Sequence, residues 1–182
     1  MNDMVPESRL NADDAVVQEA AGDRLAQTLS NLELAVQRAR EGLVRWQADC
    51  MAGAAALPAA GPEVTLLMLL AGRGEQGCSV KEMARQTNRA DIPNIQYSLR
   101  KLAGAGLVDK RGAGRTGVTY HLSDQGAELA AALSGLRAQV LLPMLEARSG
   151  LAGGLTAAAE VLDGLTALYG AAGRAAAARQ TG

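Results

Sequence analysis

Residues 77 to 122 read GCSVKEMARQTNRADIPNIQYSLRKLAGAGLVDKRGAGRTGVTYHL. Ser79 is followed three residues later by Glu82, the spacing of a capping box, in which both side chains bond backbone N–H groups at a helix start. Thr87 to Asp91 is a polar run of turn-forming residues, so it ends this first helix. The opening of the stretch therefore predicts one short, well-capped helix.

A second helix is predicted to begin at Asp91, whose carboxylate can cap it, with Pro93 in the first turn, where a missing N–H is harmless. Apolar residues then recur at spacings of three and four, which places them on one inward face: Ile92, Ile95, Leu99 and Leu102. The other face is polar and basic and carries Asn94, Gln96, Tyr97, Arg100 and Lys101. The second helix is therefore amphipathic, with long polar side chains directed outward.

A glycine-containing segment, residues 103 to 106, stops the second helix, because glycine adopts the left-handed conformation that ends many helices. Two short extended runs follow at residues 107 to 110 and 118 to 122, on either side of a basic, glycine-rich loop from 111 to 117. The runs and the loop predict a β-hairpin, or wing. Two short helices followed by a wing make a winged helix-turn-helix.

Two segments of this stretch resemble the MarR-type transcriptional regulators. Residues 99 to 108 (Leu-Arg-Lys-Leu-Ala-Gly-Ala-Gly-Leu-Val) match that family's leucine, its short linker ending in glycine, and the Leu-Val that enters the first wing strand. Residues 121 to 126 (His-Leu-Ser-Asp-Gln-Gly) match the Leu-Thr/Ser-x-x-Gly junction that leaves the second strand. The likeness covers about residues 60 to 145 and implies a DNA-binding regulator.

The resemblance also implies roles for individual residues. Asn94, Gln96 and Tyr97 fall where the family places its base-facing residues. At the tip of the wing the family usually has an Asp two residues before an Arg, whereas here Ala113 precedes Arg115. The wing arginine is thus present without the acidic partner that would orient it.

Charge is distributed unevenly along the chain, although the formal net charge is only −1. Residues 73 to 121 contain nine Lys or Arg and four Asp or Glu, a net charge of +5, which leaves −6 for the remainder. A localised basic surface on an acidic chain suits phosphate binding, since local potential matters more than the total charge. The alternative is chance clustering on a solvated surface.

The outer face of the second helix and the cations around it predict binding to double-stranded DNA. A helix fits the major groove, where a good side-chain pairing with a base contributes about 1–3 kcal/mol of discrimination. The predicted base-facing residues are Asn94, Gln96, Tyr97 and Arg100. The predicted contacts to the DNA backbone or through the wing, which set register without reading sequence, are Ser79, Lys81, Arg89, Lys101, Lys110, Arg111 and Arg115. Arg115 at the wing tip is in reach of the minor groove.

Long apolar stripes flank the winged helix-turn-helix. The first alternates spacings of four and three over three and a half heptads, the pattern of one helix packing along another, and consists of Leu25, Leu29, Leu32, Val36, Ala39, Leu43, Trp46 and Cys50. After the wing a second stripe is interrupted by Pro143, which should kink or end its helix near Leu141. Glu63 to Ala71 is predicted to be a buried helix behind the helix-turn-helix. The first stripe could pack on its own domain or on a second chain. A shared role is favoured, and a homodimer is expected.

The predicted fold class is mainly α with a small β-hairpin, a winged helix-turn-helix core flanked by N- and C-terminal dimerisation helices. The predicted boundaries are a flexible polar tail at 1–22, an N-terminal dimerisation helix at 23–57, the DNA-binding domain at 61–123, C-terminal dimerisation helices at 124–170 and a flexible tail at 171–182. A two-fold dimer implies a pseudo-palindromic DNA site.

The amino-acid composition also bears on the fold class and on the cellular compartment. Aromatic residues make up 2% of the chain and Phe is absent, so the core is built from Leu, Val, Ala and Met, which suits helices better than a β-sandwich. Two cysteines indicate a reducing compartment. The first ten residues lack a signal-peptide pattern, and the longest apolar run, Val64 to Ala71, is too short to span a bilayer. A cytoplasmic location with no membrane partner is expected.

No enzyme, metal site or cofactor is predicted. His121 is the only histidine and lies at a strand end, and Cys50 and Cys78 lack metal-type spacing. Three alternatives remain open. A winged helix can serve as a protein–protein interaction module within a larger assembly, and Cys78 near a helix start could sense oxidants. The resembled family often binds phenolic or other aromatic effectors, and Trp46 and Met51 lie in the corresponding region.

Overall fold

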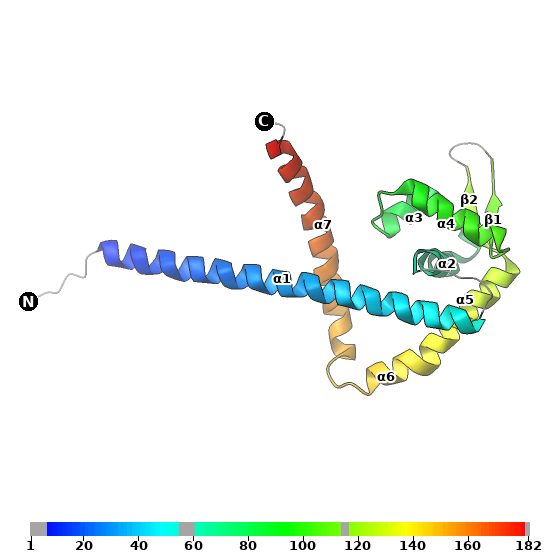
Figure 1. Cartoon of the computed structure of the whole chain (residues 1–182), viewed down its shortest axis with the longest axis horizontal. Coiled ribbons are helices and arrows are strands. Elements are labelled where there is room, and N and C mark those ends of the chain that lie inside the picture. The colour runs from blue at the N-terminus through cyan, green and yellow to red at the C-terminus, as the bar shows by residue number, and fades with distance from the viewer. Residues whose placement is uncertain (1–6, 55–60, 114–116, 181–182) are drawn as a thin grey trace, which may run out of the picture. The chain divides into compact units, whose positions relative to one another are not determined.

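The structure, a computed structural model, describes residues 7–54, 61–113 and 117–180. It divides into two compact units, Met1–Ala127 and Glu128–Gly182. Helices dominate the described residues, and one two-stranded antiparallel hairpin accompanies them (Figure 1). The predicted fold class, mainly α with a small β-hairpin, is confirmed.

The elements in chain order are α1 (Glu7–Ala54), α2 (Gly61–Arg73), the 3-10 turn η1 (Gly74–Gln76), α3 (Val80–Gln86), α4 (Ile92–Gly104), β1 (Val108–Arg111), β2 (Thr119–Leu122), α5 (Asp124–Leu136), the π-helical turn η2 (Arg137–Leu141), α6 (Leu142–Glu146), the 3-10 turn η3 (Ala152–Gly154) and α7 (Leu155–Gln180). Helices α3 and α4 and the hairpin β1–β2 are the predicted helix-turn-helix and wing.

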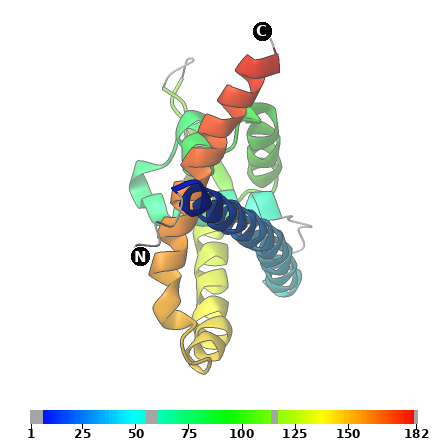
Figure 2. The same cartoon turned by 90° about the vertical axis from the view of Figure 1, so that its left-hand side faces the viewer.

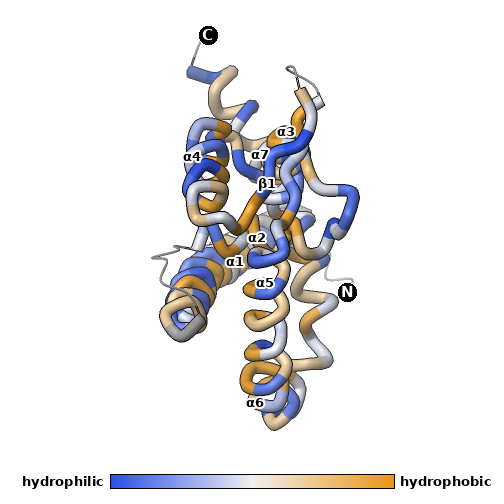
Figure 3. The backbone as a smooth tube through the Cα atoms, turned by 90° about the vertical axis from the view of Figure 1, so that its right-hand side faces the viewer, coloured by the Kyte–Doolittle hydropathy of each residue, from blue (hydrophilic) through white to orange (hydrophobic). Residues whose placement is uncertain are grey.

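The core of the first unit lies between α2, α3 and α4. Helix α2 packs against α4, and α3 packs against α4 as well. These three helices and the start of the wing contribute the following fully buried side chains: Leu66, Leu67, Leu70, Met83, Ile95, Leu99, Leu102 and Leu107. Met51 of α1 and Cys78 before α3 are fully buried as well. Three of the four residues predicted for the inner face of α4 are therefore buried, and Ile92 is half-buried at the helix start. Hydrophilic and hydrophobic colouring alternates along α4, as amphipathic packing requires (Figure 3).

Backbone hydrogen bonds join the two wing strands and also tie β2 to the segment before α3. Strands β1 and β2 pair in the register Val108↔Leu122 to Arg111↔Thr119. Beyond this ladder, Cys78 N–H donates to Tyr120 O and Tyr120 N–H donates to Cys78 O, both at 2.9 Å. The residue that precedes the helix-turn-helix thus pairs with the second wing strand, which fixes the wing against α3.

Gly126 allows the close backbone approach between the start of α5 and the residues before the wing. Ser123 Oγ donates to Gly106 O at 2.6 Å and accepts from Gly126 N–H at 3.0 Å, so one hydroxyl joins the end of α4 to the start of α5. A Cβ atom at Gly126 would clash with the carbonyl of Leu107. The glycine in the Leu-Ser-x-x-Gly motif is therefore required by this close backbone approach.

Helix α1 is longer than the sequence predicts. The expected boundaries give a polar tail at 1–22 and a helix from residue 23, whereas the backbone is helical from Glu7 to Ala54 (Figures 1 and 2). Residues 7–22 contain no proline, and eight of the 16 are strong helix formers (four Ala, two Glu, one Leu and one Arg), so helix propensity outweighs the lack of an apolar stripe there. At its other end α1 packs on α2, where Met51 is buried and Gly61 lies against Val44.

In the second unit, the helix that begins as α5 changes its winding near Pro143. The predicted disturbance near Leu141 is present as η2, where Leu142 N–H donates to Arg137 O, five residues earlier. A proline offers no N–H, and a widened turn inside an α-helix can accommodate this. Helix α7 then runs to Gln180, so the tail predicted at 171–182 is helical almost throughout, in a stretch dominated by Ala.

One described helix meets the length and composition expected of a membrane span. It is the continuous segment Asp124–Glu146, with a mean hydropathy of 1.2 in its most apolar window. A single helix of this kind is weak evidence for a membrane, because core helices pass the same test.

Candidate nucleic-acid interface

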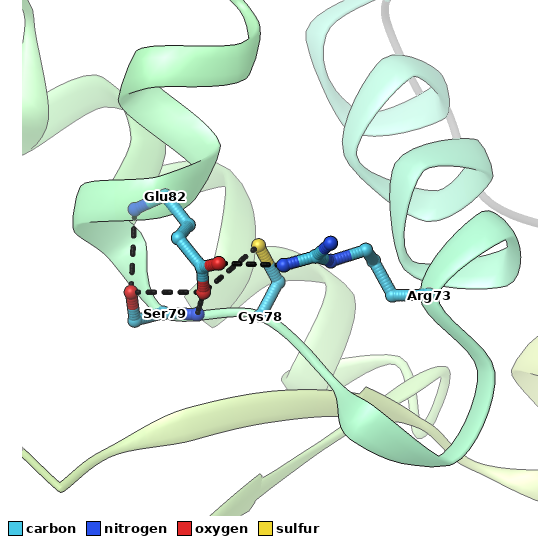
Figure 4. A network of polar contacts seen from close by, with 4 residues as sticks. All are labelled: Arg73, Cys78, Ser79 and Glu82. Atoms are coloured by element: carbon cyan, nitrogen blue, oxygen red, sulfur yellow. Dashed lines mark hydrogen bonds and ion pairs between the residues drawn. The ribbon is translucent and has the colours of Figure 1, made fainter.

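Helix α3 begins at the predicted capping box. Glu82 N–H donates to Ser79 Oγ at 3.2 Å, and Ser79 N–H donates to Glu82 Oε2 at 3.4 Å (Figure 4). The Glu82 carboxylate also pairs with Arg73 at the end of α2 and lies 3.9 Å from Cys78 Sγ. The hydroxyl of Ser79, a predicted DNA-backbone contact, is thus used inside the protein, and its backbone position fixes where α3 starts.

The four predicted base-facing residues lie on one exposed face of α4. Asn94, Gln96, Tyr97 and Arg100 are exposed, and Tyr97 keeps 60% of its surface accessible. The opposite side of the helix holds the buried Ile95, Ser98, Leu99 and Leu102. We call the exposed set the recognition face. Its side chains are long and polar, and no other part of the described chain covers them.

The carboxylate of Asp91 does not cap α4, contrary to the prediction. Its side chain makes no capping bond with the helix. Instead Arg89 donates to both carboxylate oxygens, from Nε to Oδ1 and from Nη2 to Oδ2, each at 2.9 Å, and Asn94 Nδ2 donates to Oδ2 at 2.9 Å. These bonds, with Arg89 contributing most, hold the pKa of Asp91 far below its ordinary value. Asp91 is therefore an anion that orients two predicted DNA contacts.

This arrangement leaves Asn94 able to read a base. Its side-chain amide has two N–H donors and one oxygen acceptor. The bond to Asp91 uses one donor, so the second N–H and the oxygen stay available for an adenine edge. Arg89 is only 24% exposed and already neutralised by Asp91, so it is less available for a phosphate than the sequence suggests.

Lys101 points toward the interior. Its ammonium Nζ lies 3.7 Å from Oε2 of Glu63, a residue on α2 that is 4% exposed. Ser98 Oγ donates to the other oxygen of the same carboxylate at 2.8 Å. The predicted DNA-backbone role of Lys101 is thus in competition with an ion pair behind the helix. Sequence reasoning missed Glu63 and Ser98, and its one available signal was an acidic residue in an otherwise apolar segment.

Other cations around the recognition face remain open to solvent. Lys81 on α3 and Lys110 and Arg111 on β1 are exposed. Together with Arg100, they make no ion pair within the part of the chain that the structure describes. Arg115, predicted at the wing tip, lies outside the described residues. The available cations therefore come from α3, α4 and the first wing strand.

His121 is a buried residue of the wing. Its side chain is 8% exposed, and Nε2 lies 2.8 Å from Thr119 Oγ1. A Cβ atom at Gly77 would clash with the imidazole ring, and Gly77 has a positive φ of 61°. The ring thus fills the space between the wing and the segment before α3.

The cysteines show little sign of a reactive thiolate. Cys78 is fully buried, and burial raises its pKa, with a further increase from the nearby Glu82 carboxylate. Burial and Asp49 also raise the pKa of Cys50. Among the described residues there is no group of three or more His, Cys, Asp or Glu side chains that could hold a metal ion. Met51, expected near an effector region, is a core residue at 2% exposure.

Comparisons with known proteins agree with this geometry. Residues 60–126 match the sequence model of the winged helix DNA-binding domain family. A MarR family transcription regulator of solved structure gives a TM-score of 0.61 at 16% identity, over 87% of this chain and 98% of its own. RV1404 from Mycobacterium tuberculosis gives 0.59 at 19% identity, over 73% and 92%. The S. aureus MepR–DNA complex gives 0.56 at 14% identity, over 75% and 94%.

A search of curated protein sequences gave no match. Residues 60–126 are therefore similar to a winged-helix DNA-binding domain, and the chain has the fold seen in a solved MarR family transcription regulator. The predicted resemblance is confirmed at this level.

Proposed function

We propose that this chain is a transcriptional regulator that binds double-stranded DNA sequence-specifically, as a homodimer in the cytoplasm. The observation that carries the proposal is the recognition face of α4, which is exposed on a helix whose other side is buried. A lone amphipathic helix with this orientation can enter the major groove, where base edges are distinguishable. The solved MepR–DNA complex, which shares the fold, supports the same use here.

Within the proposed complex the residues divide by chemistry. The amides of Asn94 and Gln96 can each pair with adenine through one donor and one acceptor, and Arg100 can pair with guanine. Lys81, Lys110 and Arg111 supply positive charge for phosphates on either side of the groove. Asp91 holds Asn94 in place, so its negative charge serves orientation although it lies near the DNA.

The proposed homodimer rests on apolar side chains that the described chain leaves exposed. In α1 they include Leu25 and Leu43, and in α7 they include Leu155 and Leu168, each at least 49% exposed. Exposed leucines repeated along helices mark surfaces for association. A two-fold dimer would present two recognition helices to half-sites about 34 Å apart, which is one turn of DNA.

Selection of bound fragments from a random double-stranded DNA pool tests the function directly. We expect enrichment of a pseudo-palindrome with adenine or guanine contacts in each half-site. Affinity for the enriched fragment should fall linearly with salt on logarithmic axes, with a slope that reflects several phosphate contacts. If no sequence is enriched and any binding to DNA is independent of salt concentration, the alternative of a protein–protein interaction module is favoured.

A further inference from the structure

Three polar residues around the start of α4 form a connected cluster. Arg89 donates from Nε to Oδ1 and from Nη2 to Oδ2 of Asp91, and Asn94 Nδ2 donates to Oδ2 of the same carboxylate, each bond at 2.9 Å. Asn94 belongs to the recognition face, and both Asp91 and Asn94 are exposed. We call these three residues the α4 cluster. Its hydrogen bonds are made within the chain, so the Asn94 amide is oriented before any DNA is bound.

The ionisation of the α4 cluster decides which end of the Asn94 amide faces Asp91. The bonds from Arg89, and after them the bond from Asn94, hold the pKa of Asp91 far below its ordinary value. The bonds to Asp91, with a smaller contribution from the charge of Glu63 on α2, raise the pKa of Arg89. Asp91 is therefore an anion, which can only accept hydrogen bonds. The amide must turn its NH2 group toward Asp91, and its oxygen is left for another donor.

The part of the amide that remains available matches the edge of adenine. After the bond to Asp91, Asn94 has one N–H donor and its oxygen acceptor. In the major groove adenine presents the N7 acceptor beside an N6–H donor. The amide and the base can therefore form two hydrogen bonds at once.

The other bases do not match this donor and acceptor. Guanine presents two acceptors, N7 and O6, which an amide could meet only with both of its N–H groups. Cytosine presents a donor without an adjacent acceptor, and thymine presents an acceptor beside a methyl group. Because Asp91 takes one N–H of Asn94, adenine is the one base with which the remaining groups pair twice.

This pairing depends on the hydrogen that adenine N6 turns toward the major groove. N6 carries two hydrogens, and in a Watson–Crick pair one of them bonds thymine, so the other alone faces the groove. A methyl group on N6 that preserves the base pair replaces this second hydrogen. The Asn94 oxygen would then lose its donor and lie against an apolar methyl group, and a polar atom left without a partner in an interface is costly.

We propose that binding to DNA is regulated by N6-methylation of the adenine that Asn94 reads, with the unmethylated site bound and the methylated site rejected. The proposal rests on the proposed function and deepens it by naming a chemical state of the DNA that the recognition face distinguishes. In it Asn94 touches the base, and Asp91 and Arg89 are positioning residues. The methyl group lies in the groove and leaves the phosphates unchanged, so only the sequence-specific part of the affinity is lost.

Duplexes with single modified adenines test the proposal on the full-length protein. The DNA is the fragment enriched from the random pool, synthesised in versions that each carry N6-methyladenine at one adenine position of every half-site. We expect one position at which the methyl group lowers affinity at least about tenfold, measured by fluorescence anisotropy. 7-Deazaadenine lacks the N7 acceptor but keeps the N6 group, and it should weaken binding at the same position.

Two alanine variants assign the effect to a residue. Asn94 and Gln96 are both exposed amides on α4, so their replacement leaves the core unchanged. In Asn94→Ala the methylated and unmethylated duplexes should bind equally at that position, whereas Gln96→Ala should keep the difference. A difference that is lost only in Gln96→Ala would overturn the assignment to Asn94. A difference kept in both variants would show that the methyl group acts through the DNA itself, which overturns the assignment as well.

Guanine in place of the same adenine reports on the positioning role of Asp91. In Asp91→Ala both N–H groups of Asn94 can meet guanine, so the preference for adenine over guanine should fall. Asp109→Ala, which removes an exposed acid of β1, should leave this preference unchanged. An unchanged preference in Asp91→Ala would overturn the positioning role, because the loss of a negative charge alone affects both duplexes equally.

The outcomes separate this inference from the proposed function. A protein that selects a DNA sequence but binds every methylated duplex as tightly as the unmodified one overturns the methylation sensing and leaves the regulator intact. A selected sequence without an adenine in its half-sites has the same meaning. A protein that selects no sequence overturns both the inference and the proposed function.

Discussion

The carboxylate of Glu63 lies 3.7 Å from the ammonium of Lys101, and the two residues belong to different helices. Glu63 is buried on α2, and Lys101 lies beside the recognition face of α4. The ion pair, with the Ser98 hydrogen bond to the same carboxylate, fixes the rotation of α4 about its axis. The ion pair also directs the ammonium of Lys101, one of the cations of residues 73–121, toward α2.

Replacing Glu63 by Gln should therefore strengthen binding to non-specific DNA. The amide keeps the volume and can still accept from Ser98, but it no longer holds Lys101, whose side chain is already 30% exposed. The released ammonium can reach a phosphate, so the slope of log affinity against log salt should steepen by about 0.9. Fluorescence anisotropy on random duplex DNA at several salt concentrations measures this slope.

Two controls separate charge release from loss of packing. Ser98→Ala removes the hydrogen bond to Glu63 without freeing Lys101, so it should lower stability by about 1 kcal/mol and leave the salt slope unchanged. In the double variant Glu63→Gln/Lys101→Ala the slope should return to that of the original chain. A steep slope in the double variant would show that Lys101 is not the released cation.

The contrast between Ser79 and Glu63 shows which parts of the site a sequence can predict. The capping box at Ser79 depends on atoms three residues apart, so its pattern is visible in the chain itself and the structure has it. The bond between Glu63 and Ser98 joins residues 35 positions apart, and no local pattern encodes it. Periodicity shows that α4 has an outer face, but contact with a base depends on a partner that the sequence does not contain.

Asp91 shows a different failure of local reasoning. A carboxylate at a helix start can accept hydrogen bonds either from the backbone N–H groups of the helix or from a nearby cation. The sequence pattern predicts the first of these. The guanidinium of Arg89 donates two parallel charge-assisted hydrogen bonds to the Asp91 carboxylate. Two such bonds are stronger than a single solvent-exposed capping bond, so the carboxylate pairs with Arg89. The sequence nevertheless predicts the helix boundary to within one residue, because Pro93 also marks it.

Removing the Asp91 carboxylate should weaken base discrimination. In Asp91→Ala, Asn94 loses the bond that orients its amide, so the preference for the selected site over one with the contacted adenine replaced should fall about tenfold. Affinity for random DNA should stay the same or rise, because a negative charge near phosphates is lost. Competition titrations with the two duplexes measure both quantities.

Asp109→Ala is the matched control for this experiment. Asp109 is an exposed acid on the wing strand β1 and is not part of the recognition face of α4. Its removal should raise affinity for both duplexes about equally and leave the preference unchanged. The same loss of preference in Asp109→Ala would mean that net charge, and not orientation of Asn94, explains the Asp91 result.

The lowered pKa of Asp91 predicts a pH dependence of stability. Because its pKa is lower in the folded chain than its ordinary value of 3.8, the folded state favours the ionised form. The stabilisation is fully present above the ordinary value and is lost as the pH falls through the folded value. The difference in free energy of unfolding between the original chain and Asp91→Asn should be constant above about pH 5 and should shrink below pH 4. Urea unfolding at a series of pH values measures it, and a difference that grows in acid would contradict the assignment.

Base-reading and phosphate-contacting residues should differ in what their loss changes. Arg100→Ala and Gln96→Ala should each reduce affinity for the selected site by about 1–3 kcal/mol while affecting random DNA much less. Lys110→Ala, on an exposed wing strand, should weaken binding to both duplexes about equally and reduce the salt slope by about one. Equal losses on both duplexes for all three variants would remove the base-reading assignment of α4.

Gly126 and Gly135 lie on the same helix, α5, and should respond in opposite directions to alanine. A Cβ at Gly126 would clash with the Leu107 carbonyl, whereas one at Gly135 would meet no atom within 4 Å. Gly126→Ala should lower stability by about 1–3 kcal/mol, because the backbone must move to relieve the overlap. Gly135→Ala should raise it by about 0.5–1 kcal/mol, since alanine restricts the unfolded chain and favours helix. Urea unfolding of both variants measures the two changes, and a neutral Gly126→Ala would show that the wing-to-α5 junction is looser than the Ser123 hydrogen bonds require.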